Sequence, residues 1–288
     1  MKIDKQQVQQ GDRKMAGIRN IKCFGKKKKT YSRTEFCCER DGLVIRGTEY
    51  RPKGDRLPVA VVCHGFMAYQ DTVKQYAMAL AELGYLACTF DFCGGSVIKG
   101  KSGGRTTEMS VLTEIRDLEC VLCYVTGKSY ADPDNITVMG CSQGGFVSAL
   151  TAAKGIFPVK KLVLFYPAFC IPYDARAGKM LWASFHPQHI PETFRCGPMK
   201  LGACYVKDVI EMKPYREIQG YAGDVLIVHG AKDKLVHPKY SKRAFRAYRR
   251  SGAARKVRFE ILKNGKHGFS KKADKQAVSI LREFMTAQ

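Results

Sequence analysis

Hydrophobic residues follow two alternating patterns from about residue 34 onward. Short runs rich in β-branched and apolar residues, such as 58–64 and 135–140, are typical of buried strands. Between these runs lie longer stretches in which apolar residues recur every three or four positions, which is typical of helices packed on a sheet. The alternation predicts an α/β fold with a mostly parallel sheet flanked by helices.

The chain order predicts how this sheet begins and continues. Asp41-Gly42 lies between runs at 34–40 and 43–52 and is a strong hairpin signal, so we expect an opening antiparallel pair. Further strands are predicted at 58–64, 86–92, 135–140, 161–167, 224–230 and 256–262. Helices are predicted near 70–84, 107–126, 143–154, 238–251 and 271–286.

The rhythm of strands and helices is interrupted between the sixth strand and the next. Residues 171–222 mix prolines with aromatic residues, among them Trp182, Phe185, Phe194 and Tyr205. A connection of this length inside a compact domain is usually functional, although an insertion without a functional role is the alternative. We predict an inserted cap or lid at 171–222, with the core formed by 34–170 and 223–288.

Composition and charge narrow the class of protein. The chain of 288 residues is 45% hydrophobic and 26% charged, as in ordinary globular proteins. The net charge of +23 is attractive to polyanions, but it gathers in residues 1–33 and in the run 242–250. We interpret these as a basic N-terminal extension and a solvated helix face. No nucleic-acid-binding motif is present, so we predict no specific nucleic-acid partner.

The lengths of the apolar runs and the pattern of cysteines indicate the cellular compartment. No apolar run approaches the length of a membrane-spanning helix, and the first residues lack the apolar stretch of a secretion signal. We therefore expect a cytoplasmic protein with no membrane span. The twelve cysteines are interpreted as reduced thiols, and the lone pair Cys120 and Cys123 lacks partners at zinc-ligand spacing. We predict no metal and no cofactor.

Gly140-Cys141-Ser142-Gln143-Gly144 joins a predicted strand to a predicted helix. A serine on such a tight strand-to-helix turn projects its hydroxyl from the carboxyl edge of the sheet, and small flanking residues allow the sharp bend. Glycine turns also occur there for packing reasons alone. Ser142 is therefore a candidate nucleophile whose case depends on its partners.

Two partners follow in the required chain order. Asp233 comes after the strand at 224–230, and His267 comes after the strand at 256–262. Because ligands gather at the carboxyl ends of parallel strands, three such loops can converge there. An imidazole can take the serine proton and later return it, while an aspartate orients the imidazole. His229 and His237 are interpreted instead as packing or loop residues.

The strand at 58–64 ends in His64-Gly65-Phe66, where a backbone N–H can point toward a developing oxyanion. The second N–H of such a site comes from the residue after the serine. We predict Phe66 and Gln143 as the oxyanion hole, although a simple strand-ending turn also explains the His-Gly pair.

Residues 95–102 match the spacing of a phosphate-binding loop and raise a nucleotidase as an alternative. A phosphate-binding loop runs directly into a helix at its serine, whereas Ser102 is followed by two glycines and the helical pattern begins only near Thr107. A further alternative is a binding module that has lost catalysis, since fold does not determine function. The complete serine, aspartate and histidine set argues against it.

Five segments together are similar to the α/β-hydrolase superfamily: HGF at 64–66, DFCGGS at 91–96, GCSQGG at 140–145, HGAKD at 229–233 and GKHGF at 265–269. The opening at 39–52, the helix at 107–122 and the cap after the sixth strand resemble bacterial cinnamoyl and feruloyl esterases. Monoacylglycerol lipases and serine peptidases of the prolyl oligopeptidase type are more distant. DFCGGS lacks the last glycine of the commoner DFxGHGxS form.

The resemblance implies a serine carboxylic-ester hydrolase that works through an acyl-enzyme, with a small-molecule ester as its partner. Hydroxycinnamate or short-chain aryl esters are the implied substrates, and lipase or peptidase activity on the same fold is the alternative. Aromatic residues of the cap, with Trp182 and Phe185 as candidates, would form an apolar wall for the acyl group. Packing within the cap explains these two residues almost as well.

Overall fold

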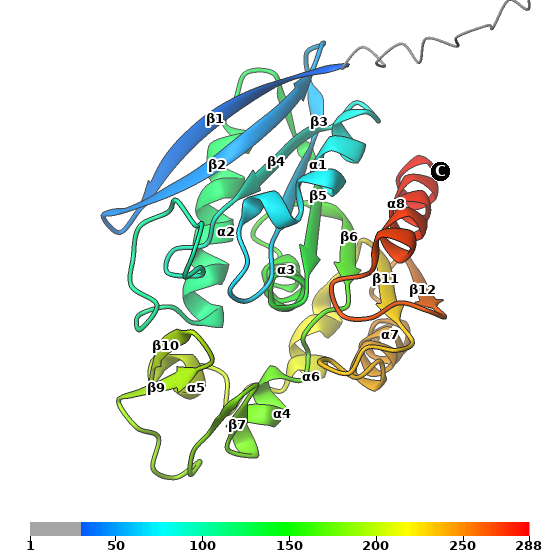
Figure 1. The fold of residues 1–288 in the computed structure, drawn as a ribbon. Coiled ribbons are helices and arrows are strands. Elements are labelled where there is room, and N and C mark those ends of the chain that lie inside the picture. The colour runs from blue at the N-terminus through cyan, green and yellow to red at the C-terminus, as the bar shows by residue number, and fades with distance from the viewer. Residues whose placement is uncertain (1–29, 288) are drawn as a thin grey trace, which may run out of the picture.

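The computed structural model describes residues 30–287 and places eight strands of that range in one twisted sheet (Figure 1). Their order across the sheet is β1-β2-β4-β3-β5-β6-β11-β12. The bounds are β1 Tyr31–Arg40, β2 Leu43–Pro52, β3 Leu57–Cys63, β4 Leu86–Phe90, β5 Ala131–Cys141, β6 Val159–Phe165, β11 Asp224–Gly230 and β12 Lys256–Leu262. β1 and β2 form the predicted antiparallel hairpin, β2 also pairs antiparallel with β4, and every later pairing is parallel. The predicted fold class is confirmed.

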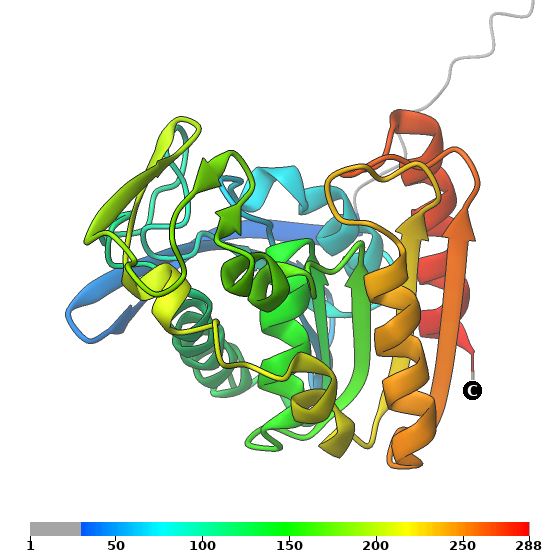
Figure 2. The same ribbon diagram turned by 90° about the horizontal axis from the view of Figure 1, so that it is seen from below.

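Helices cover both faces of the sheet (Figure 2). α1 (Lys74–Ala81) and α8 (Lys271–Thr286) pack on one face, while α2 (Val111–Thr126), α3 (Gln143–Ala153) and α7 (Lys239–Ser251) pack on the other. Alternate residues of each central strand point to opposite faces, so the valines at 59 and 61 belong to the second core and residues 60 and 62 to the first. Continuous apolar strands are therefore buried on both sides.

Two helices begin later than the hydrophobic pattern predicts. The predicted helix at 70–84 is a short 3₁₀ turn, η1 (Gln70–Thr72), followed by α1. The predicted start near residue 107 moves to Val111, because Ser110 caps α2. Its hydroxyl accepts from the Thr113 N–H (3.3 Å), and the Thr113 hydroxyl accepts from the Ser110 N–H (2.8 Å).

Residues between β6 and β11 form only short elements. These are α4 (Ile171–Arg176), β7 (Lys179–Met180), β8 (Ala183–Ser184), β9 (Thr193–Cys196), β10 (Met199–Gly202), α5 (Cys204–Lys207), α6 (Pro214–Glu217) and η2 (Ile218–Gly220). We refer to residues 171–222 as the inserted segment. In Figure 1, β7, β9, β10 and α5 lie beyond the ends of α2 and α3, on one side of the sheet. The Ser110 hydroxyl ties α2 to Asp208 of this segment at 2.5 Å.

Most of the predicted basic extension, residues 1–29, lies outside the described residues. Within residues 30–287, none of the helices combines the length and apolar character needed to cross a bilayer.

Candidate active site

Ser142 occupies the turn between the last residue of β5 and the first residue of α3. Its backbone angles, φ of 54° and ψ of −120°, lie in a region that residues other than glycine rarely adopt. Neighbouring backbone holds this conformation, because the Ser142 N–H donates to the Phe165 carbonyl (2.9 Å) and its carbonyl accepts from the Ala168 N–H (2.9 Å). A strained backbone conformation of this kind persists only where surrounding contacts hold it in place, and such conformations are common at functional sites.

The two glycines of the motif are required by close approaches of backbone. A side chain on Gly140 would place its first carbon 2.1 Å from the Gly144 carbonyl oxygen. A side chain on Gly144 would place that carbon 2.1 Å from the carbonyl oxygen of His64, which follows β3. The motif therefore packs the start of α3 directly against the ends of β5 and β3, and this packing brings the serine beside the loop that carries Phe66.

Three side chains from three separate loops meet at the carboxyl edge of the sheet. The Ser142 hydroxyl lies 3.0 Å from His267 Nε2, and His267 Nδ1 lies 2.8 Å from Asp233 Oδ2. Asp233 follows β11 and is buried, while His267 follows β12 and is partly exposed. The order of contacts is that of a nucleophile, its base and the carboxylate that orients the base.

Several hydrogen-bond donors surround Asp233 and stabilise it as a carboxylate. Its Oδ1 accepts from the Leu235 and Val236 N–H groups at 2.9 Å each. Its Oδ2 lies close to both His267 and His229. Burial by itself would raise the pKa of Asp233, but the hydrogen bonds from these two imidazoles outweigh it and hold that pKa below its usual range.

His229 is a contact of this site that the sequence pattern does not reveal. It ends β11, is buried, and its Nε2 lies 3.1 Å from Asp233 Oδ2 and 2.9 Å from the Val236 carbonyl oxygen. Both partners only accept, so Nε2 carries a proton, and Nδ1 accepts from the Ser241 hydroxyl at 2.7 Å. The sequence signal that could have identified this contact is the short separation of four residues between His229 and Asp233.

Phe66 and Gln143 both line the cavity that contains Ser142. Among the described residues, neither of their backbone N–H groups donates to a protein acceptor. Gln143 is the first residue of α3, whose N-terminal amides point out of the helix and carry partial positive charge. The arrangement leaves two donors free for an oxygen that becomes negative beside the serine.

His64 fixes the loop that carries Phe66. It is fully buried, its Nε2 accepts from the Phe92 N–H at 3.1 Å, and its Nδ1 donates to the Gly65 carbonyl at 2.8 Å. Burial lowers the pKa of His64, in keeping with a neutral ring that uses one nitrogen as acceptor and one as donor. Gly65 lies so close to the serine that an added Cβ would be 3.0 Å from Ser142 Cβ.

A cavity of about 320 Å³ opens beside Ser142 and His267. Its apolar walls include Phe66, Tyr166, Ile171, Met180, Trp182 and Tyr205. Trp182 is one of the two predicted cap residues and remains 66% exposed at this cavity. The other, Phe185, is not among the lining residues and instead packs against Phe194, with ring centroids 5.4 Å apart.

Asp174 of α4 contributes the one carboxyl group among the residues that line this cavity. Partial burial raises the pKa of Asp174. A carboxyl group within largely apolar walls is an acceptor for a hydroxyl or cationic group of a ligand. The sequence contains no local pattern around Asp174 that would have identified it.

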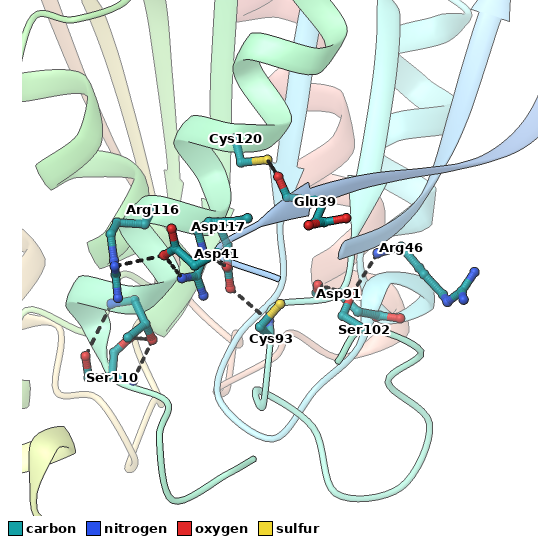
Figure 3. A network of polar contacts seen from close by, with 12 residues as sticks. Glu39, Asp41, Arg46, Asp91, Cys93, Ser102, Ser110, Arg116, Asp117 and Cys120 are labelled. Atoms are coloured by element: carbon teal, nitrogen blue, oxygen red, sulfur yellow. Dashed lines mark hydrogen bonds and ion pairs between the residues drawn. The ribbon is translucent and has the colours of Figure 1, made fainter. Parts of the chain in front are cut away.

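The segment that resembles a phosphate-binding loop is folded around an aspartate of the protein. The Lys101 N–H donates to Asp91 Oδ2 (2.8 Å), the Lys101 ammonium group pairs with Glu35 (3.1 Å), and the Ser102 hydroxyl donates to the Asp91 carbonyl (2.6 Å). Figure 3 shows Ser102 beside Asp91, and no helix begins at Ser102. The groups that would bind phosphate therefore have other partners, and the nucleotidase alternative loses its support.

Cys120 lies on α2, where its thiol donates to the Glu39 carbonyl of β1 at 3.3 Å (Figure 3). Within residues 30–287, no group of three or more His, Cys, Asp or Glu side chains is placed to hold a metal ion.

Two family models match the chain. The model described as serine aminopeptidase, S33, matches residues 56–201, which is about half of the chain and includes Ser142. The model described as the prolyl oligopeptidase family matches residues 180–287, which include Asp233 and His267. No curated protein matches the sequence.

Solved structures of other proteins share the fold. Est1E from Butyrivibrio proteoclasticus, solved with bound ferulic acid, superposes with a TM-score of 0.79 at 24% identity and covers 87% of this chain and 97% of its own. An esterase from Pyrococcus furiosus has a TM-score of 0.64 at 18% identity, covering 88% and 91%. Acetyl xylan esterase 1 from a Thermoanaerobacterium species has a TM-score of 0.62 at 18% identity, covering 89% and 84%. At these identities the likeness shows the α/β-hydrolase fold.

Proposed function

Because the chain belongs to the serine aminopeptidase S33 family of α/β-hydrolases, we propose that it is a serine carboxylic-ester hydrolase acting through an acyl-enzyme. The observation that carries the proposal is the contact chain from the Ser142 hydroxyl through His267 to Asp233 at one wall of a cavity. In this proposal Ser142 is the nucleophile, His267 is the general base and acid, and Asp233 orients the imidazole. The Phe66 and Gln143 N–H groups form the oxyanion hole.

The first half of the reaction forms the acyl-enzyme. Ser142 Oγ attacks the ester carbonyl carbon while its proton moves to His267 Nε2, 3.0 Å away. The carbonyl oxygen becomes negative and accepts hydrogen bonds from the two free N–H groups. When the tetrahedral intermediate collapses, the bond to the leaving oxygen breaks and His267 returns the proton to that oxygen. Alcohol leaves, and the acyl group stays on Ser142.

The second half uses water in place of the alcohol. Water attacks the acyl carbon as His267 Nε2 takes one of its protons, and the same two N–H groups bind the second oxyanion. Collapse breaks the bond to Ser142 Oγ, which regains its proton from His267, and the carboxylic acid leaves. The depressed pKa of Asp233 keeps that group charged throughout, so it stabilises the imidazolium at each stage.

For the substrate we propose hydroxycinnamate or short-chain aryl esters, with the inserted segment 171–222 acting as the cap. The aromatic walls formed by Phe66, Tyr205 and Trp182 favour a flat ring, since each aromatic pair contributes about 0.5 to 1.5 kcal/mol beyond area burial. Asp174 is suited to accept a hydrogen bond from a ring hydroxyl. That Est1E was solved with ferulic acid supports the same substrate class.

The nucleophile is tested by Ser142→Ala, which should abolish hydrolysis of aryl esters while leaving the melting temperature close to that of the wild type. A fluorophosphonate probe should label the wild type on Ser142 alone, as located by peptide mass mapping. Label on another serine, or full activity in the alanine variant, would contradict the mechanism.

The substrate class is tested by a panel of methyl ferulate, methyl cinnamate, long-chain glycerides and aminoacyl amides. Methyl ferulate should give the highest kcat/KM. Asp174→Asn should lower kcat/KM for methyl ferulate more than for methyl cinnamate, which lacks ring hydroxyls. The family model is described as an aminopeptidase, so amide hydrolysis is the second candidate. Faster cleavage of amides than of all esters would establish it in place of the esterase.

A further inference from the structure

Glu114 is a buried acid beneath the oxyanion-hole residue that the mechanism above does not use. It lies in the first turn of α2 and is 1% exposed. Among the described residues its Oε2 has no hydrogen-bond partner, while its Oε1 faces the loop after β4, 3.5 Å from the position of a Cβ at Gly95. A buried polar atom without a partner is rare and costly, so it requires an explanation.

The Gln143 side chain lies between Glu114 and the inserted segment. It is fully buried, and its Oε1 accepts a hydrogen bond from the Tyr205 hydroxyl of α5. The Gln143 Nε2 lies 3.9 Å from Met109 Sδ, and the Gln143 side chain also interacts with Glu114, whose charged form it favours. The Gln143 side chain therefore lies between Tyr205 on one side and Glu114 on the other.

Tyr205 also contacts the other candidate oxyanion residue. Its ring packs against the Phe66 ring, with centroids 5.5 Å apart. One line of contacts thus runs from Glu114 in α2 through Gln143 to Tyr205, and from there to Phe66.

Within residues 30–287, the titratable groups that interact with Glu114 supply no positive charge. They are Asp117 on α2, Cys63 on β3 and Tyr205 on α5. Burial raises the pKa of the Cys63 thiol and of the Tyr205 hydroxyl, so both stay neutral. Burial, opposed in part by Gln143 and aided by Asp117, raises the pKa of Glu114 to about 8.

Resting on the proposed function, we propose that Glu114 is a positioning residue that supports the oxyanion hole only while it is uncharged. As a neutral acid it lies beside the Gln143 side chain, which stays bonded to the Tyr205 hydroxyl, and it adds no charge there. As a carboxylate it places a buried negative charge beside the residue that must stabilise a second negative charge in the transition state.

The test is the pH dependence of kcat/KM for a methyl hydroxycinnamate, with spontaneous hydrolysis subtracted. Wild-type activity should fall on the alkaline side with a midpoint near the pKa of Glu114, about 8, and drop about tenfold for each further pH unit. Glu114→Gln keeps an acceptor and cannot ionise, so it should retain near-wild-type activity at pH 7 and lose this alkaline limb. A role in folding alone would move the melting temperature without moving the limb.

Asp117→Asn is the matched control. Asp117 lies one turn further along α2, is also buried, and pairs with Arg40 rather than with Gln143 (Figure 3 labels Asp117). The Asn variant should keep the alkaline limb, with its midpoint moved to lower pH because Asp117 no longer helps to raise the pKa of Glu114. If Glu114→Gln melts too early for assay, Glu114→Leu replaces it. A limb that persists unshifted in folded Glu114 variants, or a wild type that has no limb, overturns the proposal.

Fluorophosphonate labelling separates this inference from the proposed substrate. The reaction at phosphorus needs the same nucleophile and the same oxyanion donors, but no ester substrate. If the wild type fails to cleave hydroxycinnamates yet labels Ser142 more slowly above pH 8 than at pH 7, and Glu114→Gln does not, the proposed function fails while the role of Glu114 stands. Equal pH dependence of labelling in both proteins overturns that role.

Discussion

Replacing His229 by leucine removes a buried N–H donor from Asp233, the carboxylate proposed to orient the imidazole of His267. In the structure His229 Nε2 lies 3.1 Å from Asp233 Oδ2, and no solvent can take its place because both side chains are fully buried. Asp233 then keeps His267 and two backbone N–H groups as donors. The remaining hydrogen bonds hold the carboxylate less tightly, so His267 is less well aligned with the serine.

The magnitude follows from the charge on the acceptor. A hydrogen bond to a charged group contributes about 1.5 to 3 kcal/mol, which corresponds to roughly a tenfold to hundredfold change in an equilibrium or rate constant. We expect His229→Leu to lower kcat by about that factor with little change in KM. We also expect a loss of about 1 to 3 kcal/mol in the free energy of unfolding at pH 7, since the Ser241 hydroxyl loses its partner too.

Steady-state kinetics and urea unfolding at several pH values check this prediction. The folded-state pKa of Asp233 lies below its unfolded value, so its contribution to stability is present above the unfolded pKa of about 3.9 and is lost as the pH falls. The variant has a higher folded-state Asp233 pKa, whereas the unfolded-state pKa is common to both proteins. The stability gap attributable to this group should therefore persist at pH 4 and narrow only as the pH falls through the folded-state pKa values, that of the variant first. Ser241→Ala, which leaves the Nε2 contact in place, should have the smaller effect on kcat. Wild-type kcat in His229→Leu, or an equal loss in Ser241→Ala, would refute this reasoning.

Three further predictions concern the loops around the serine. Gly65→Ala should lower kcat/KM for aryl esters by about tenfold or more, because its Cβ would lie 3.0 Å from Ser142 Cβ and displace the loop that carries Phe66. Lys101→Ala should leave kcat/KM nearly unchanged, since Lys101 pairs with Glu35 at the surface, and the wild type should show no ATP binding that depends on Lys101. Trp182→Ala should raise KM for aryl esters with little change in melting temperature, whereas Phe185→Ala should lower the melting temperature and leave KM nearly unchanged.

Each of these predictions has an outcome that would contradict it. Full activity in Gly65→Ala would mean that the loop yields without moving the oxyanion donors. Nucleotide binding that depends on Lys101, measured by calorimetry, would revive the phosphate-loop alternative. A change in KM for Phe185→Ala as large as that for Trp182→Ala would place both residues in contact with substrate.

The sequence by itself determined the sheet, most helices and the positions of the candidate catalytic residues along the chain. Strands buried on both faces are nearly continuous apolar runs, and hairpin turns have local signatures, so Asp41-Gly42 was sufficient to predict the opening hairpin. Ser142, Asp233 and His267 each follow a predicted strand in parallel register, and parallel strands end at one edge. Convergence of those loops therefore follows from the order of strands along the chain.

The tertiary structure decided which other side chains reach that edge. His229 lies beside Asp233, Asp174 lines the cavity and Glu114 interacts with Gln143. These contacts depend on how β11, α4 and α2 pack. No periodicity of the sequence indicates toward which residue each of these side chains points. The same holds for the two predicted cap aromatics, of which Trp182 lines the cavity and Phe185 packs on Phe194. Hydrophobic patterns report which face of an element is buried, whereas contacts between residues distant in sequence depend on the angles at which whole elements pack.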